Sequence, residues 1–338
     1  FEKGAACVIS EKELPDEERS YIKVESSLQA LKDLALLYRN NLDVKVVGIT
    51  GSVGKTSTKE TISSVLSEKY RVLKTLGNFN NEIGLPLTVF RLTEDDEVAV
   101  LEMGISDFGE MDRLSKIAQP DICVITNIGF CHLENLGTRD GILKAKTEIF
   151  NHMNPDGIVI VNGDDDKLST ISQVHGKRPL VFGISNKDGV YADNIKSLGL
   201  DGTSFTIHGI KTSDNYSTFD LTVPVPGHHM VYNAMAAALV GSVLGLSSIE
   251  IERGVKNLKT IAGRNNIIKE NGFTIIDDCY NANPVSMKAS LDVLDTAIGR
   301  KVAILGSMFE LGENEKQMHY DVGMYLGTKD IDVLITAG

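Results

Sequence analysis

The chain has 338 residues, of which 42% are hydrophobic and 24% are charged, and its formal net charge is −12. This length and composition are typical of a globular protein with two or three domains. The acidic balance argues against nucleic acid as a partner, and the absence of any run of about 18 apolar residues argues against membrane insertion.

Four cysteines are scattered along the chain without a C-x-x-C spacing, at Cys7, Cys123, Cys131 and Cys279. Cys123 and Cys279 lie in apolar segments that resemble strands, where a buried free thiol is the expected state. A reducing compartment suits such a set better than a disulfide framework does, so we expect a cytoplasmic protein.

The first 43 residues predict a short strand, at 6–9, and a helix from about Ser26 to Asn40. The leucines of that helix recur at helical spacing and are expected to lie in the core: Leu28, Leu31, Leu34 and Leu37. The pattern opens without a preceding element and closes on an apolar strand at 333–338. We therefore expect the natural protein to extend beyond both ends.

From Val44 onward, apolar strands alternate with helical segments. The strands are expected at 44–50, 97–104, 121–129 and 157–165. Apolar strands separated by helices predict an α/β fold, with a central parallel sheet of the phosphate-loop type that has helices on both faces.

The later part of the chain shows two further patterns. Residues 186–226 alternate over short pieces and predict a small antiparallel patch, and the alanine-rich segment 233–245 predicts a closely packed helix. A new series of strands and helices begins near Gly263, which predicts the first part of a Rossmann-like domain (strands at 273–279, 301–306 and 333–338, and a helix at 286–297).

The strongest local signal is a glycine-rich turn between a predicted strand and a predicted helix. It consists of Gly51, Ser52, Val53, Gly54, Lys55, Thr56 and Ser57. In this setting backbone N–H groups and the helix N-terminus bind phosphate, the lysine contacts the terminal phosphates and the threonine hydroxyl ligates Mg²⁺. Ile49 stands where the commoner motif has its first glycine, so this is a tighter version. The motif predicts that the chain binds ATP or a related nucleotide. It does not indicate which reaction the nucleotide drives.

Three polar residues follow the predicted strands at the edge where α/β proteins bind ligands. Glu102 ends one strand, His132 follows the next, and Lys146 lies in the helix after that. A carboxylate near a phosphate loop is a natural Mg²⁺ ligand. Taken singly, His132 and Lys146 are more typical of surface residues.

The order and spacing of these motifs resemble the Mur ligases over nearly all of the chain. The segments that carry the resemblance are TGSVGKTS, GNFNNEIGLPLT, LEMG, TNIGFCHLENLGT, KAKTEIF, PGHHMVYNAMAAA, the pair Gly263-Arg264, IIDDCYNANPVSM and LGSMFELG. Several of them are most similar to the family members that add D-alanyl-D-alanine to UDP-N-acetylmuramoyl-tripeptide. The resemblance implies an ATP-dependent amide ligase of peptidoglycan precursor synthesis. We expect the protein to be a monomer.

The resemblance also implies three domains. Residues 1–43 would be the end of a domain for the UDP-linked substrate, 44–261 the central ATP-binding ligase domain, and 262–338 the start of a Rossmann-like domain for the amino acid or dipeptide. A hinge is expected near 261–263, where the last domain closes and excludes water from an acyl phosphate.

Specific roles follow from the matching positions. One Mg²⁺ would be held by Thr56, Glu102 and the ATP phosphates, and a second by His132 with the support of Lys146. The family lysine at this position is carbamylated, which turns a cation into a carboxylate-like anion. Lys144, two residues earlier, does not match.

The nucleotide and the substrate would contact further matched residues. Asn233 is expected to face the adenine, Arg264 to reach the ATP phosphates, and Asp278, Tyr280 and Asn281 to lie on the ribose side. Asn80 and Asn81 are expected to face the muramoyl substrate. At Met230 the chain departs from the family, which often has asparagine there.

Two alternatives remain open from the sequence. A related ligase could add another amino acid, as do the Mur-type enzymes of folate polyglutamylation and cyanophycin synthesis. A nucleotide-binding module could instead hydrolyse ATP for conformational work, although such a module needs no second metal site.

Overall fold

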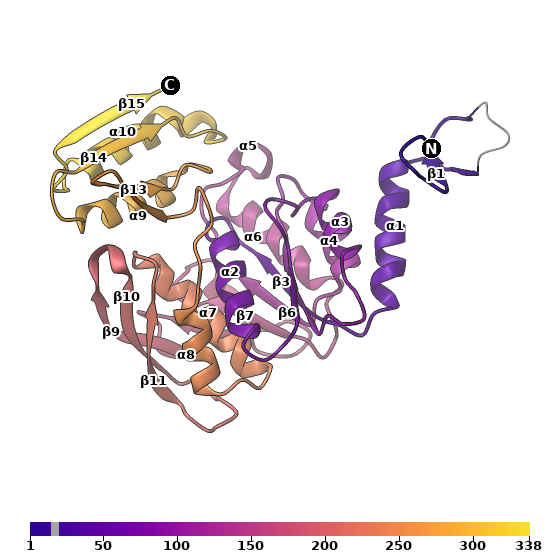
Figure 1. The fold of residues 1–338 in the computed structure, drawn as a ribbon, viewed down its shortest axis with the longest axis horizontal. Helices are drawn as coiled ribbons and strands as arrows, with labels where there is room; N and C mark the ends of the chain where they lie inside the picture. The colour runs from indigo at the N-terminus through magenta and orange to yellow at the C-terminus, as the bar shows by residue number, and fades with distance from the viewer. Residues whose placement is uncertain (15–19) are drawn as a thin grey trace.

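The computed structural model describes residues 1–14 and 20–338, and the described residues are built around a nine-stranded sheet (Figure 1). Its strand order is β11-β10-β9-β8-β7-β6-β3-β5-β4. The strands are β3 (Lys45–Thr50), β4 (Val72–Lys74), β5 (Val98–Glu102), β6 (Ile122–Ile125), β7 (Ile158–Asn162), β8 (Leu180–Gly183), β9 (Val190–Ser197), β10 (Thr203–His208) and β11 (Thr218–Val223). All pairs from β4 to β9 are parallel, which confirms the predicted α/β class.

Helices cover both faces of this sheet because its central strands are apolar on both sides. In β3, Val47 and Ile49 face one core, whereas Val46 faces the other, as alternation along a strand requires. The first core contains α2 (Lys55–Leu66), α7 (His229–Val243) and α8 (Ser248–Lys256). The second contains α1 (Ser27–Asn40), α3 (Gly84–Val89), α4 (Glu110–Ala118) and α6 (Arg139–Thr147).

Small residues let the helices of the first core approach closely. The alanines of α7 are buried, as predicted, and α7 packs along α2. On α8, a Cβ at Gly254 would lie 2.4 Å from the Cα of Val65, so only glycine fits this contact. The helix that begins at the phosphate loop is thereby fixed against the sheet.

The predicted antiparallel patch is part of the main sheet. Strand β9 pairs in parallel with β8 and antiparallel with β10, and β10 pairs antiparallel with β11. Figure 1 shows these strands as one end of the sheet, next to the C-terminal elements.

The C-terminal residues form two separate two-stranded sheets with helices. An antiparallel hairpin joins β12 (Asn266–Glu270) and β13 (Phe273–Asp277), and a parallel pair joins β14 (Val302–Gly306) and β15 (Val333–Ala337). The helices are α9 (Pro284–Asp295) and α10 (Glu315–Leu326). The sequence did not predict β12 or α10, and the strand predicted at 273–279 pairs in a hairpin because β12 precedes it directly.

The remaining elements are short. They are β1 (Val8–Ser10), β2 (Tyr21–Lys23) and α5 (Leu133–Leu136), with 3₁₀ turns at Glu148–Phe150, Leu168–Thr170, Gly199–Asp201 and Gly312–Asn314. Among the described residues, no helix has the length and apolar character needed to cross a membrane.

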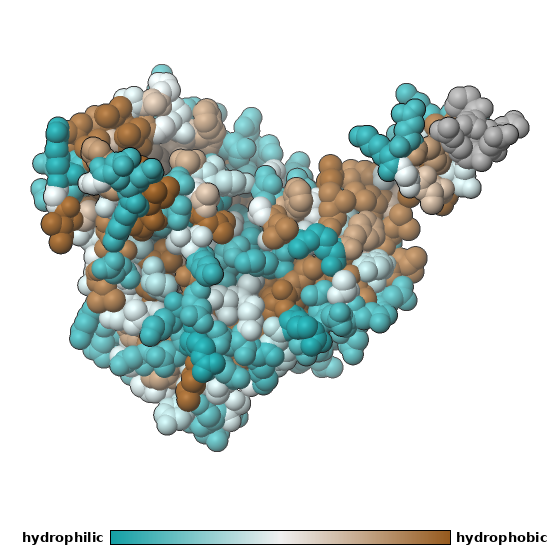
Figure 2. All heavy atoms as spheres, in the orientation of Figure 1, coloured by the Kyte–Doolittle hydropathy of each residue, from teal (hydrophilic) through white to brown (hydrophobic). Residues whose placement is uncertain are grey.

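The prediction that the leucines of α1 are core residues was wrong. Leu28, Leu34 and Leu37 are exposed, and Figure 2 shows apolar side chains along α1 and the adjoining surface. The buried stripe carries Lys32 and Arg39 instead. Arg39 donates to the carbonyl oxygens of residues 42, 44 and 118. Its guanidinium therefore has hydrogen-bond partners, while the aliphatic part of the side chain is buried.

The prediction of two buried thiols was half right. Cys123 is fully buried in β6, where burial raises the pKa of its thiol. Cys279 is exposed, because β13 ends two residues earlier and the thiol donates to the Asp277 carboxylate at 3.1 Å.

Candidate active site

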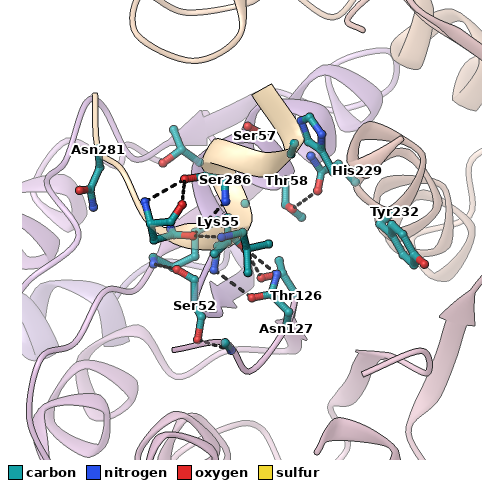
Figure 3. Close-up of a pocket in the computed structure, with 18 of the residues that line it drawn as sticks. Ser52, Lys55, Ser57, Thr58, Thr126, Asn127, His229, Tyr232, Asn281 and Ser286 are labelled. Atoms are coloured by element: carbon teal, nitrogen blue, oxygen red, sulfur yellow. Dashed lines mark hydrogen bonds between the residues drawn. The ribbon is translucent and has the colours of Figure 1, made fainter. Parts of the chain in front are cut away.

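The phosphate loop lies between β3 and α2 and is braced by the segment that follows β6. Asn127 accepts from the Val53 N–H at 2.9 Å and donates to the Val53 carbonyl oxygen at 2.9 Å, while Thr126 donates to the same oxygen at 2.7 Å. Figure 3 shows these side chains beneath the loop, with Lys55 above them. The Lys55 ammonium donates to the Gly51 carbonyl oxygen at 2.9 Å, so it is already held over the loop.

Gly51→Ala should disrupt this loop. The backbone φ at Gly51 is +150°, and an added Cβ would lie 1.9 Å from the Thr126 hydroxyl. The substitution is expected to cost about 1–3 kcal/mol of stability and to weaken ATP binding at least tenfold, measured by thermal melting and nucleotide titration. Gly323→Ala is the matched control, since nothing lies within 4 Å of the added Cβ. ATP affinity unchanged in Gly51→Ala would contradict the proposed loop role.

Glu102 lies at the end of β5 and is almost fully buried beside the phosphate loop. Its Oε1 accepts from Thr56 Oγ1 at 3.2 Å and from Asn80 Nδ2 at 2.8 Å. Its Oε2 is buried without a hydrogen-bond partner, and the nearest ammonium, that of Lys59, is 3.8 Å away. Lys59 itself pairs with Glu60 at 3.1 Å.

This arrangement fits a divalent cation. Mg²⁺ prefers oxygen ligands, and Glu102 and Thr56 present a carboxylate and a hydroxyl at one point next to the phosphate loop. A buried oxygen without a hydrogen-bond partner is costly, and the Lys59 ammonium at 3.8 Å offsets this cost only in part, so a cation bound at Oε2 would stabilise it. Lys59 was missed by sequence reasoning, although its place one turn after Lys55 gives it the same face of α2.

Lys146 lies in the last turn of α6 and is 1% exposed. Burial, together with the nearby charge of Lys55, lowers the pKa of Lys146 to about 8. Lys144, in contrast, is exposed and lies over the Phe108 ring. The structure therefore separates the two lysines, because burial favours the neutral amine at Lys146 whereas Lys144 lies at the surface.

His132 precedes α5 and adopts a left-handed backbone, with φ of +55°. Its Nδ1 lies 2.7 Å from Glu310 Oε2, in the loop after β14. Burial lowers the pKa of His132, and the Lys146 and Lys55 charges add to that effect while Glu310 opposes it. His132, Lys146 and Lys55 are thus close enough to influence one another electrostatically.

A cavity of about 640 Å³ connects the phosphate loop with the C-terminal elements. This volume is in the range of small-molecule sites. Its lining includes residues 52–58, Asn80, Glu102, Asn162, Asp164, Tyr232, Asn233, Arg264, Asp278, Tyr280, Asn281 and Ser286. Figure 3 shows Asn281 on one side of Lys55 and His229 and Tyr232 on the other, with Ser286 close to Lys55.

The nucleotide-side residues predicted from the sequence all lie on this cavity. Asn233 accepts from Thr58 Oγ1 at 3.0 Å, and its amide nitrogen lies 3.2 Å from the sulfur of Met230. The Arg264 guanidinium stacks 4.1 Å above the Tyr280 ring centroid. Asp278 accepts from the Asn265 N–H at 3.1 Å and from the Ser290 hydroxyl.

Four other predicted site residues are not part of the cavity lining: Gly51, Asn81, His132 and Lys146. Asn81 uses its side-chain oxygen to accept from the N–H groups of Ile83 and Gly84, so it supports the start of α3 and is not part of the cavity lining. Tyr232 donates to Asp164 at 2.8 Å, and both residues line the cavity. Neither Tyr232 nor Asp164 was predicted from the sequence to belong to the site. The aspartates at the end of the predicted strand at 157–165 are the sequence feature that could have indicated this part of the cavity.

Comparisons with known proteins agree with this geometry. The family description "Mur ligase middle domain" matches residues 49–241, and "Mur ligase, glutamate ligase domain" matches 263–338. The UDP-N-acetylmuramoyl-tripeptide--D-alanyl-D-alanine ligase of Bacillus subtilis is 41% identical over 100% of the chain and 73% of the relative. The Escherichia coli ligase of the same name is 33% identical over 99% and 73%.

Solved structures give the same result. The chain superposes on MurF from Acinetobacter baumannii with a TM-score of 0.90 at 35% identity, covering 98% of the chain and 71% of that protein. It superposes on MurF ligase from Thermotoga maritima in complex with ADP with a TM-score of 0.87 at 33% identity, covering 98% and 76%. With its phosphate loop, its strand-end carboxylate and both matching family descriptions, the chain belongs to the Mur ligase family.

Proposed function

We propose that this chain is an ATP-dependent ligase that joins D-alanyl-D-alanine to UDP-N-acetylmuramoyl-tripeptide. The relatives at 41% and 33% identity carry that name over the full length of the chain. The observation that supports a ligase over a simple nucleotide-binding module is the buried amine of Lys146 beside His132 and Lys55. A module that only binds nucleotide gains nothing from a lysine amine buried next to its phosphate site.

The reaction proceeds through an acyl phosphate. A terminal carboxylate oxygen of the tripeptide attacks the γ-phosphorus of ATP, and ADP leaves. The amine of D-alanyl-D-alanine then attacks the acyl carbon, loses a proton, and expels inorganic phosphate to leave an amide. Lys55 and the N–H groups at the start of α2 hold the phosphates in position.

Two Mg²⁺ sites are part of this proposal. Glu102 and Thr56 would hold one, and His132 with a carbamylated Lys146 would hold the other. When bound, such cations neutralise charge that develops on the transferring phosphoryl group. The neutral amine of Lys146, favoured by burial, is the form that adds CO₂ to become a carbamate.

The C-terminal elements complete the site. Arg264, Asp278 and Tyr280 line the cavity opposite the phosphate loop. The proposed domain boundary near residue 262 coincides with a tight turn, in which Gly263 has φ of +75° and donates its N–H to Asp277 at 2.8 Å. Asn80 lies between Glu102 and Gly104, where it could also reach the muramoyl substrate.

The test is to measure which amine supports phosphate release from ATP. We expect release only when UDP-N-acetylmuramoyl-tripeptide and D-alanyl-D-alanine are both present, with mass spectrometry showing one amide product per phosphate. Single amino acids serve as competing amines. Release driven by glutamate or another single amino acid would replace the proposed substrate with a different one.

A further inference from the structure

Glu310 is a C-terminal residue whose carboxylate reaches the central part of the molecule. Its Oε2 lies 2.7 Å from Nδ1 of His132, although 177 residues separate them in the chain. Figure 1 shows α5, which begins directly after His132, on the side of the central sheet nearest the C-terminal helices. Glu310 lies in the segment LGSMFELG, but no role for this residue was predicted from the sequence.

The loop that carries Glu310 is fixed on both sides. Met308 and Leu311 are buried in the C-terminal core, and the Met308 N–H donates to His319 Nε2 at 3.0 Å. Between them Glu310 adopts a left-handed backbone, with φ of +60°, which is uncommon for glutamate. The anchored neighbours therefore hold the Glu310 carboxylate in the direction of His132.

This contact determines which ring nitrogen of His132 is available to a ligand. A carboxylate accepts, so the nitrogen that faces it at 2.7 Å carries the hydrogen. In a neutral imidazole the other nitrogen, Nε2, then keeps its lone pair. Histidines that ligate metals usually donate their second ring N–H to a carboxylate or carbonyl in this way.

We propose that Glu310 is a positioning residue for the second cation site. It holds His132 in the tautomer that presents Nε2 to a divalent cation, and it does so from the C-terminal elements. Cation affinity at this site therefore depends on where those elements lie. This inference rests on the proposed function, because it assumes that His132 is a cation ligand.

The experiment measures Mn²⁺ binding by electron paramagnetic resonance in the full chain, with a non-hydrolysable ATP analogue and bicarbonate present. Glu310→Ala is expected to weaken one of the two Mn²⁺ sites by 10–100-fold, as loss of such a carboxylate typically does. Glu310→Gln keeps an acceptor for the Nδ1 hydrogen and is expected to weaken it less than tenfold. Glu313→Ala, three residues away in the exposed 3₁₀ turn that follows the loop, is the matched control and should bind as the wild type does.

A double-mutant cycle separates positioning from a general effect on the fold. In a His132→Ala background, Glu310→Ala should produce no further weakening, because the residue through which it acts is gone. Circular dichroism checks that each variant is folded, and Glu310→Gln carries the test if Glu310→Ala is not. Wild-type affinity in a folded Glu310 variant, or equal weakening in both backgrounds, would overturn the inference.

The same measurement distinguishes this inference from the proposed function. Mn²⁺ binding is read without either ligase substrate, whereas the function is read by substrate-dependent phosphate release. Weakened Mn²⁺ binding in Glu310→Ala supports the inference even if no amide forms. Amide formation with unaltered Mn²⁺ binding in Glu310→Ala supports the function and rejects the inference.

Discussion

Replacing Lys146 with alanine is expected to lower ligase turnover by about 10³-fold or more. The substitution removes the amine that would become the carbamate, and with it the support for the second cation. Losing several kcal/mol of charge stabilisation in the transition state corresponds to this factor. The measurement is substrate-dependent phosphate release at saturating ATP and Mg²⁺.

The matched control is Lys144→Ala, which removes an exposed lysine two residues away on the same helix. It should retain turnover within about twofold, since surface substitutions rarely matter. Added acetate or another short carboxylate should partly restore Lys146→Ala by supplying the missing anion. Equal turnover in the two variants would exclude a catalytic role for Lys146.

The fraction of Lys146 that carries the carbamate should also depend on pH, because only one protonation state of the amine can form it. Burial lowers the pKa of Lys146 to about 8, and only the neutral amine reacts with CO₂. At fixed dissolved CO₂, carbamate occupancy should therefore rise steeply as the pH increases toward about 8. Above that pH it should keep rising, less steeply, until the site is saturated, because carbamate formation from the neutral amine itself releases a proton. Carbon-13 NMR of the chain equilibrated with labelled CO₂ would follow the carbamate directly.

Glu102→Gln should reduce turnover by about 10²–10³-fold and abolish the Mg²⁺ dependence of ATP binding. The amide keeps an oxygen that can accept from Thr56 and Asn80, so the local packing is preserved. What is lost is the negative charge on the buried group that the cation would neutralise. Lys59 keeps Glu60 as a partner, which limits the structural damage.

Glu97→Gln is the control for this experiment. Glu97 directly precedes β5, at the opposite end of the strand from Glu102, and its side chain is 43% exposed. It should bind Mg²⁺ and ATP as the wild type does. If Glu102→Gln retained wild-type Mg²⁺ dependence, the first cation would have to be placed elsewhere.

The local features of the site could be predicted from the sequence because they depend on short segments. The strand before Gly51 and the helix from Lys55 are continuous in the chain, and Glu102 ends an apolar strand whose direction is set by the parallel sheet. The preference for Lys146 over Lys144 came from the family resemblance. Burial then supplied an independent physical reason for it.

Features that depend on distant segments could not be predicted in this way. The leucine spacing in α1 indicates a helix but not which stripe is buried, and the stems of Lys32 and Arg39 occupy the buried side. The contact between His132 and Glu310 joins a loop of the central part of the chain to a loop of the C-terminal part. Neither loop has a periodic pattern that would have indicated the contact.

The most direct test of the account follows oxygen from the substrate. UDP-N-acetylmuramoyl-tripeptide labelled with ¹⁸O in its terminal carboxylate is incubated with ATP, Mg²⁺, D-alanyl-D-alanine and the chain. The acyl-phosphate mechanism predicts one ¹⁸O in each phosphate released, in step with amide formation, because the attacking carboxylate oxygen leaves with phosphorus. Release of unlabelled phosphate, independent of the tripeptide, would show that the chain only hydrolyses ATP and would contradict the ligase mechanism.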